Sequence, residues 1–225
     1  MSFKITTTTL GVPSNIHYDE ITSYLQTQRE TINKSFDILN FIDTKQFIHR
    51  IRHFIEPVVC RWIVYESEKY ADHHGGWTTR RHANFPTTDL PICRIQGLNI
   101  WLHNLIILNI FPIIETKFKF NKHYLSISDL FVVKYEIGKQ EHLEFHRDGS
   151  IISFNILLNS EKEFNGGGTI IKHLQNKPKT YHINQGDLLL HYGIVDHSGG
   201  LITNGTRYIL VGFINFMVDY KNRNR

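Results

Sequence analysis

Cysteine is scarce in this chain, and so are the other features that would place it in a specialised class of protein. Its 225 residues include two cysteines, Cys60 and Cys93, which are too few for a disulfide framework and lack the spacing of a metal-binding pair. Residues 1–9 contain no apolar core of a signal peptide. The most apolar stretch, around residues 105–114, is interrupted by an asparagine and a proline and is too short to span a bilayer. We therefore expect a soluble, cytoplasmic protein with no membrane partner.

A strong charge imbalance is missing as well. The net charge is +4 and the isoelectric point is about 9.0, but no block of lysine and arginine stands out. This charge is compatible with a nucleic acid or an acidic substrate, yet it does not predict a basic binding surface. The content of 41% hydrophobic and 20% charged residues is ordinary for a globular protein with a sizeable core. Composition therefore neither favours nor excludes nucleic acid, and it does not indicate an oligomeric state.

The chain divides into a polar part, a helical part and a strand-rich part. Residues 1–43 are predicted to form a polar arm, and residues 44–225 a single domain with a helical buttress (44–124) and a barrel core (125–216). Apolar residues at helical spacing predict a helix from Thr44 to Ile55. Further helices are expected from Pro57 to the glycine pair at 75–76, and over about 98–118 with a kink at Pro112. Their expected ends rest on proline and glycine signals.

From residue 125 onwards, the apolar pattern changes to short strands separated by turn residues. Strands are predicted at 131–136, 142–147, 151–158, 169–174, 179–183, 187–191 and 207–216. Because the helices come first and the strands after them, without βαβ alternation, the order predicts an α+β domain. In such a domain the helices cover one side of an antiparallel sheet.

Two histidines, one aspartate and one arginine suggest a metal centre with an anion site beside it. His146 and Asp148 stand two residues apart at the end of a predicted strand, where alternate side chains share a face, and His197 lies downstream. Two imidazoles and one carboxylate leave three positions of a non-haem Fe(II) ion open. Arg207 opens an apolar strand, and a guanidinium fixed there can bind a carboxylate through two hydrogen bonds. The alternative is a set of hydrogen-bonded core histidines without metal. A second His-x-Asp match, at 17–19, stands in a polar stretch without a strand pattern, and we interpret it as solvated surface.

Several linked motifs around these residues occur in the order known from one enzyme family. They are FVVKY (131–135), HRDGS (146–150), FNILLN (154–159), FNGGGT (164–169) and the stretch from His197 to Tyr208. Residues 129–216 resemble the catalytic domain of the Fe(II)/2-oxoglutarate-dependent oxygenases of the prolyl 4-hydroxylase-like type, and most of all its lysyl hydroxylase (procollagen-lysine dioxygenase) branch. The resemblance implies a double-stranded β-helix (jelly-roll) barrel with the metal at its open end. It also implies Fe(II), 2-oxoglutarate and O2 as cofactor and co-substrates, with ascorbate as a further candidate.

The resemblance assigns roles to further residues. It implies that the far carboxylate of 2-oxoglutarate meets Arg207, while the near end of the molecule chelates the metal. Tyr135 matches a tyrosine that reaches the oxo acid, and Asn155 is an inward-facing amide that needs a partner; both are candidate cofactor-binding residues, and a barrel-wall role is the alternative for Tyr135. The chain departs from some relatives at Leu157, where they have a tyrosine, and at Ile209, where other branches have a serine. His191 is either a group near the cofactor or a satisfied core histidine.

The loop 77–89 is the best candidate for substrate contact, because it combines Trp77, Arg80, Arg81 and His82 without periodicity. The alternative is a solvated loop that docks on the barrel by its aromatic side chains. The predicted function is a dioxygenase that hydroxylates a prolyl or lysyl side chain of a protein or peptide and converts 2-oxoglutarate to succinate. Alternatives are an oxygenase of nucleic acid or of a small metabolite, and a catalytically silent barrel that binds a partner.

Overall fold

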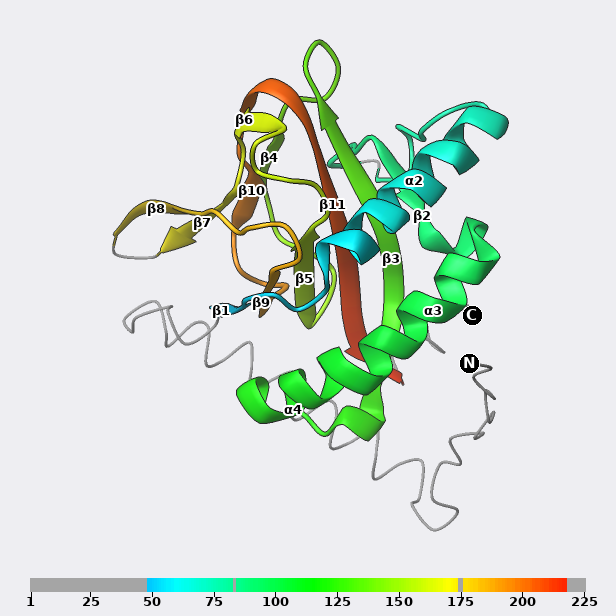
Figure 1. Cartoon of the computed structure of the whole chain (residues 1–225). Coiled ribbons are helices and arrows are strands. Elements are labelled where there is room, and N and C mark those ends of the chain that lie inside the picture. Colours follow the sequence, from blue (N-terminus) through cyan, green and yellow to red (C-terminus); the bar gives the residue numbers. More distant parts are fainter. Residues whose placement is uncertain (1–47, 83, 174–175, 218–225) are drawn as a thin grey trace. The chain divides into compact units, whose positions relative to one another are not determined.

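The computed structural model describes residues 48–82, 84–173 and 176–217 (Figure 1). The predicted polar arm, 1–43, lies outside the described residues, as does Leu174 in the predicted strand 169–174.

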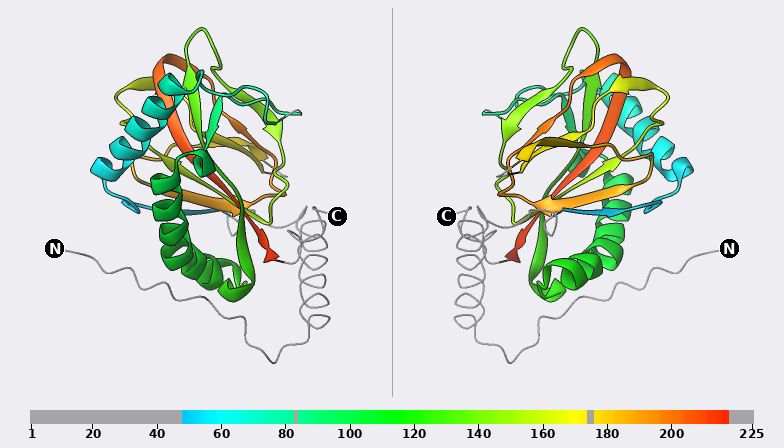
Figure 2. Two further views of the ribbon diagram at one scale, coloured as in Figure 1. Left: turned by 90° about the vertical axis from the view of Figure 1, so that its right-hand side faces the viewer. Right: turned by 90° about the vertical axis from the view of Figure 1, so that its left-hand side faces the viewer.

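Two antiparallel sheets form the strand-rich part of the fold (Figures 1 and 2). The larger sheet has the order β1 (Ile48–Ile51), β9 (Leu188–Tyr192), β5 (Ile152–Leu157), β11 (Ile202–Phe216), β3 (Leu125–Glu136) and β2 (Asp89–Pro91), with β6 (Phe164–Gly166) paired to β11. The smaller sheet has the order β4 (Leu143–His146), β10 (His197–Gly199), β7 (Thr169–His173) and β8 (Asn176–Tyr181). The α+β jelly-roll prediction is thereby confirmed, although the strands of the described residues stay in separate sheets and do not close into one hydrogen-bonded barrel.

All seven predicted strands are present with shifted ends, and four short ones were not predicted: β1, β2, β6 and β10. The longest pairing joins β11 to β3, with Arg207 opposite Tyr135 and Ile209 opposite Val133. Directly opposite residues of an antiparallel pair point to the same face of the sheet. The register therefore places the arginine and the tyrosine side by side on the inner face.

The predicted helix 44–55 is wrong over its described part. Ile48–Ile51 form strand β1, which pairs with β9 along its whole length, and His53 then adopts a left-handed backbone with φ 52°. The apolar residues do recur at helical spacing, but the segment instead adds an edge strand to the larger sheet, where its backbone pairs with β9 and three of its four side chains are partly buried. Tertiary pairing outweighs local periodicity here.

The helix α2 (Pro57–His73) confirms the prediction of a helix that begins at Pro57 and ends before a glycine pair. Gly75 and Gly76 have φ of 83° and 92°, the left-handed region in which glycine carries no steric penalty. One face of α2 is buried through Cys60, Ile63, Ser67 and Ala71. Figure 2 shows α2 and the following helix on the same side of the larger sheet, as the helices-then-strands order predicts.

Gln96–Phe118 is one continuous helix of 23 residues, in which the π-helical segment η4 (Ile106–Ile110) joins α3 (Gln96–Leu105) to α4 (Phe111–Phe118). Pro112 lacks an N–H and crowds the preceding turn, and the wider π turn just before it accommodates the ring. By its length and its mean hydropathy of 1.6, this helix could cross a membrane. The expectation that the most apolar stretch of the chain is too short to span a bilayer is therefore wrong. That criterion is weak by itself, because core helices of soluble proteins also meet it.

A polar cluster around Glu68 ties α2 to the larger sheet. The Glu68 carboxylate accepts hydrogen bonds from Lys134 Nζ (2.8 Å), from Trp77 Nε1 (3.0 Å) and from the Tyr208 hydroxyl. These partners come from β3, from the loop after α2 and from β11, and they lower the pKa of Glu68 against the opposing effect of its burial. Because Tyr208 follows Arg207, the cluster fixes β11 at the residue next to the predicted anion site.

Candidate active site

The predicted metal ligands converge. One ligand atom each of His146, Asp148 and His197 lies within 4.8 Å of the others. The Asp148 oxygens are 3.4 Å from His146 Nε2 and 3.5 Å from His197 Nε2. His146 ends β4 and lies directly opposite His197 at the start of β10. The spacing had suggested that Asp148 shares a strand with His146, and this is wrong. Strand β4 ends at His146, and the Asp148 carboxylate reaches the imidazoles from the irregular segment that follows.

The remaining ring nitrogens hold both imidazoles in one orientation. His146 Nδ1 lies 2.7 Å from the Glu144 carbonyl oxygen and His197 Nδ1 lies 2.9 Å from that of Val195. An Nδ1–H that donates to a carbonyl leaves Nε2 as the free lone pair, which is the form that binds a metal. Burial lowers the pKa of His197 to about 3, so its imidazole is neutral at physiological pH. The donor set and its orientation therefore fit a divalent metal ion of the Fe(II) type.

A pocket of about 250 Å³ opens at these three residues. Its lining comes from both sheets: the metal triad lies on and beside the smaller one, while Tyr135, Asn155 and Arg207 lie on the larger one. Apolar side chains make up much of the remaining wall: Phe85, Phe131, Val133, Leu143, Ile209, Val211 and Phe213. The pocket thus combines the predicted metal ligands with two arginines, the buried Arg207 and the more exposed Arg147, and with apolar walls.

Arg207 is an uncompensated buried cation. Its side chain is among the largest fully buried ones, and Nη1 has no hydrogen-bond partner among the described residues. Its guanidinium lies 5.4 Å from the centre of the Tyr135 ring. Burial lowers the pKa of Arg207 to about 10, so the group stays charged at neutral pH. A buried donor without an acceptor is costly, and an anion placed in this pocket would remove the cost. The arginine therefore fits the far carboxylate of a dicarboxylic oxo acid.

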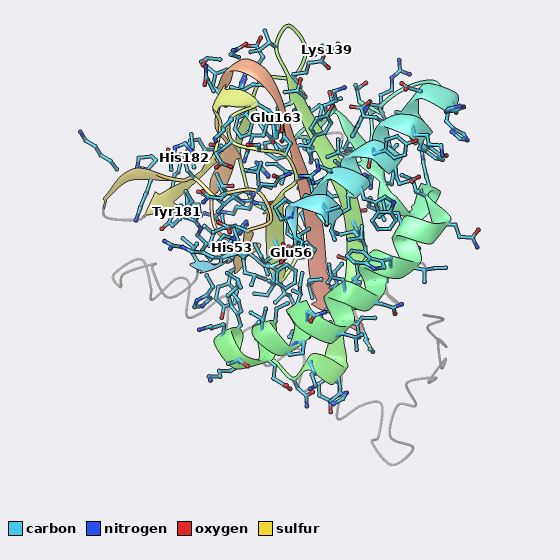
Figure 3. The ribbon with its side chains drawn as sticks, in the orientation of Figure 1. His53, Glu56, Lys139, Glu163, Tyr181 and His182 are labelled. Carbon is cyan, nitrogen blue, oxygen red and sulfur yellow. The ribbon has the colours of Figure 1, made fainter. Side chains whose placement is uncertain are left out.

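The backbone on both sides of Arg207 is held by one amide. Asn159 Nδ2 donates to the Thr206 carbonyl oxygen at 2.8 Å, and the Tyr208 N–H donates to Asn159 Oδ1 at 2.9 Å. Asn159 Nδ2 also lies 3.2 Å from a carboxylate oxygen of Glu163, whose position is labelled in Figure 3. This brace was not predicted, because its residues lie far apart in the sequence and their roles depend on the strand pairing.

The other predicted cofactor-binding residues line the same pocket. Tyr135 is buried beneath the guanidinium, and Asn155 Nδ2 lies 3.5 Å from Thr169 Oγ1. Close packing requires glycine beside both Tyr135 and Arg207, because a Cβ at Gly199 would lie 2.5 Å from the Tyr135 hydroxyl oxygen and one at Gly167 would lie 3.0 Å from Arg207 Cδ. This packing role of Gly167 and Gly199 was not predicted from the sequence.

Leu157 and Ile209, where the sequence departs from the pattern of the family that it resembles, are apolar residues. Leu157 belongs to the hydrophobic core cluster together with Tyr135 and Ile209. His191 lies against the site without joining it: its ring centre is 4.4 Å from that of His197, its Nδ1 is 2.9 Å from the Tyr192 carbonyl oxygen, and its buried Nε2 has no partner among the described residues. It is a neighbour of the metal ligands and is not satisfied as a core histidine.

The loop 77–89 divides into an anchoring part and a pocket-lining part. Trp77 donates to Glu68, and Arg81 donates to both Asp129 oxygens (2.9 and 2.7 Å) and to Asp89 (3.1 Å), so these side chains dock the loop. The residues that face the pocket are His82, Asn84, Phe85 and Thr87, and the ring centre of Phe85 is 5.1 Å from that of His146. Arg80 is exposed and does not line the pocket. The loop is therefore docked on the fold and also lines the pocket, and His82 and Thr87 do both through their contacts with Asp89. Contact between this loop and a substrate stays a prediction.

Curated proteins with a similar sequence are procollagen-lysine dioxygenases. No protein-family model matches it. Procollagen-lysine,2-oxoglutarate 5-dioxygenase 2 from Homo sapiens is 33% identical over 175 residues, which cover 68% of this chain and 23% of that protein. The chain thus spans less than a quarter of the length of the curated relatives it matches.

Solved structures share the fold at low sequence identity. A Pseudomonas putida prolyl-4-hydroxylase has a TM-score of 0.53 and 14% identity, covering 76% of this chain and 93% of that one. A Trichoplax adhaerens prolyl hydroxylase in complex with a peptide of the hypoxia inducible factor oxygen degradation domain has a TM-score of 0.59 and 12% identity, covering 93% and 97%. The chain therefore belongs to the procollagen-lysine dioxygenase family, and its fold is the one found in the solved prolyl hydroxylase structures.

Proposed function

We propose that this protein is an Fe(II)- and 2-oxoglutarate-dependent dioxygenase that hydroxylates a prolyl or lysyl side chain of a protein or peptide. The observation that carries the proposal is the buried Arg207, whose Nη1 has no partner in the part of the chain that the structure describes, in the same pocket as His146, Asp148 and His197. A module that only binds a partner gains nothing from an unpaired buried cation beside a set of metal ligands. An enzyme that binds a dicarboxylic oxo acid between them does.

The residues of the pocket divide the work. His146, Asp148 and His197 would hold Fe(II), which together with 2-oxoglutarate supplies the activation of O2 and the oxidation of a C–H bond when bound. Arg207 would bind the far carboxylate of 2-oxoglutarate bidentately, and Tyr135 and Asn155 would contact the oxo acid along its length. The apolar wall keeps water from competing for these polar groups.

The substrate class is proposed from the relatives and from the pocket mouth. The relatives are named for procollagen lysine, and one solved neighbour holds a peptide. On this chain Phe85 and His82 line the pocket and the Phe85 ring packs against that of His146, which suits an aliphatic side chain that enters from a polypeptide. Ascorbate as an accessory reductant and a cytoplasmic location remain predictions.

The activity can be tested with peptides whose target residue is varied. The purified protein would be incubated with Fe2+, 2-oxoglutarate and ascorbate, together with collagen-like Gly-X-Y peptides that contain proline only, lysine only, or neither. We expect one oxygen atom to be added to a proline or lysine peptide, seen by mass spectrometry, with one succinate released for each oxygen atom added. If nucleic acid or a small metabolite were oxidised and no peptide were, the proposed substrate class would be rejected. The proposed Fe(II)- and 2-oxoglutarate-dependent oxidation would still stand.

Changes in the loop should separate substrate binding from cofactor binding. We expect Phe85→Ala and His82→Ala to reduce turnover of a peptide substrate about 10-fold or more, because each removes a side chain at the pocket mouth worth roughly 1–3 kcal/mol. Substrate-independent decarboxylation of 2-oxoglutarate should stay near the wild-type rate, since neither residue lies on the Arg207 side of the pocket. Arg80→Ala is the matched control in the same loop. Parallel loss of both activities in Phe85→Ala would place the loop in the cofactor site instead.

A further inference from the structure

One hydroxyl group holds the carboxylate of the metal triad. Ser153 Oγ donates to Asp148 Oδ2 at 2.5 Å, and Ser153 is 1% exposed. Ser153 lies on β5, directly opposite His191 of β9, so its side chain comes from the larger sheet while His146 and His197 come from the smaller one. The hydroxyl is therefore the point at which the larger sheet supports the metal ligands.

A second hydroxyl sets the direction of this hydrogen bond. Ser150 Oγ lies 2.7 Å from Ser153 Oγ. A serine has one proton to donate, and an ionised carboxylate can only accept. Since the Ser153 proton is directed to Asp148, the Ser150 hydroxyl must donate to Ser153. The two hydrogen bonds therefore point in the same direction, from Ser150 to Ser153 and from Ser153 to Asp148. Donation from Ser150 strengthens the hydrogen bond that Ser153 makes.

The backbone around this chain leaves the carboxylate little freedom. The Asp148 N–H donates to the Gly193 carbonyl oxygen at 2.8 Å, and the Gly193 N–H donates to that of Ile151 at 3.0 Å. A Cβ at Gly193 would lie 2.1 Å from the Ser150 carbonyl oxygen, so the turn that carries Ser150 is pressed against this glycine. Both the main chain of Asp148 and the serine that acts on its side chain are held in the same small region.

We infer that Ser153 is a positioning residue for the metal centre, which fixes the rotamer of Asp148 so that the carboxylate faces the two imidazoles before any metal arrives. The inference rests on the proposed function only in taking the triad to be a metal site. Metal-binding side chains are commonly oriented by such partners, whose removal costs about 10- to 100-fold in metal affinity or activity. Ser150 acts through Ser153 and should therefore have no effect of its own once Ser153 is removed.

The test measures metal binding without any turnover. Co2+ would be titrated into metal-free wild type, Ser153→Ala, Ser150→Ala and the double variant, with the visible absorption of bound Co2+ as the spectroscopic signature. We expect Ser153→Ala to weaken Co2+ binding about 10- to 100-fold, and the Co2+ spectrum to change. Ser150→Ala should weaken binding less, and the double variant should match Ser153→Ala alone because the two hydroxyls act in series.

A buried serine elsewhere gives the matched control. Ser67 is also fully buried, and its hydroxyl donates to the Ile63 carbonyl oxygen within α2. Ser67→Ala removes the same group at the same burial and should leave Co2+ affinity unchanged. Equal Co2+ affinity in wild type and Ser153→Ala, or additive losses in the double variant, would overturn the inference. A wild type that binds no Co2+ at all would instead reject the proposed metal site.

Discussion

Replacement of Arg207 by alanine should weaken 2-oxoglutarate binding about 30- to 1000-fold, which corresponds to about 2–4 kcal/mol. The reason is Arg207 Nη1, which has no acceptor among the described residues, so that a carboxylate of the oxo acid would supply the missing one. A bidentate, charge-assisted pair in a closed pocket is worth several neutral hydrogen bonds. The metal ligands are untouched, so Fe(II) binding should survive. The affinity of Arg207→Lys for 2-oxoglutarate should lie between those of the wild type and Arg207→Ala, because an ammonium keeps the charge but cannot form the bidentate pair.

Calorimetric titration of 2-oxoglutarate into protein loaded with Mn2+ under argon would measure this effect. Arg80→Ala serves as the control, since it removes an exposed arginine that does not line the pocket. The rival explanation makes Arg207 a purely structural residue. In that case the variant would lose thermal stability with and without 2-oxoglutarate, and its affinity for the oxo acid would equal that of the wild type.

Asp148→Ala should reduce 2-oxoglutarate turnover to the background of the metal-free protein. The change removes one of three metal ligands and leaves two imidazoles, His146 and His197, without the anion between them. His146→Ala and His197→Ala should act alike. The fold should persist in all three, because none of these residues belongs to the hydrophobic core cluster. Circular dichroism would verify the fold, and succinate release would report the turnover.

A neighbouring carboxylate provides the matched control for Asp148. Asp196 precedes His197 and pairs with Arg147 at 2.9 Å on the protein surface, so Asp196→Asn should change turnover only slightly. Retained iron-dependent turnover in Asp148→Ala would contradict the ligand assignment. Zn2+ or Ni2+ in the purified protein would not, because the affinity of such a site follows the general order of divalent metals and not the function.

The convergence of His146, Asp148 and His197 could be predicted from the sequence, because this combination of residue types is rare and their order is informative. A short His-x-Asp match occurs twice in this chain, and only the copy at 146–148 has strands around it with a histidine and an arginine downstream. The long strands could be predicted for a similar reason, since β3, β5 and β11 carry enough apolar residues to show their pattern.

What the sequence could not reveal depends on partners far away in the chain. Strand β1 has a helical apolar spacing and becomes a strand only because β9 lies beside it. The three-residue strands β2, β6 and β10 are too short to show any period. The hydrogen bond from Ser153 to Asp148 depends on the fold of the segment that joins them. The lack of a partner for Arg207 Nη1 among the described residues depends on all the side chains packed around it. Such features emerge from packing and have no local signal.

The division of the pocket between two sheets has a consequence for the motions of the protein. The smaller sheet carries two of the three proposed metal ligands, His146 on β4 and His197 on β10. These strands have four and three residues and are joined by only two registered pairs. Strands this short are among the first to open in local unfolding. An oxo acid that reaches from the metal to Arg207 would fasten the smaller sheet to the larger one. Amide hydrogen exchange in β4 and β10 should therefore slow sharply only when metal and 2-oxoglutarate are both bound, so that the cofactor works as a removable cross-link.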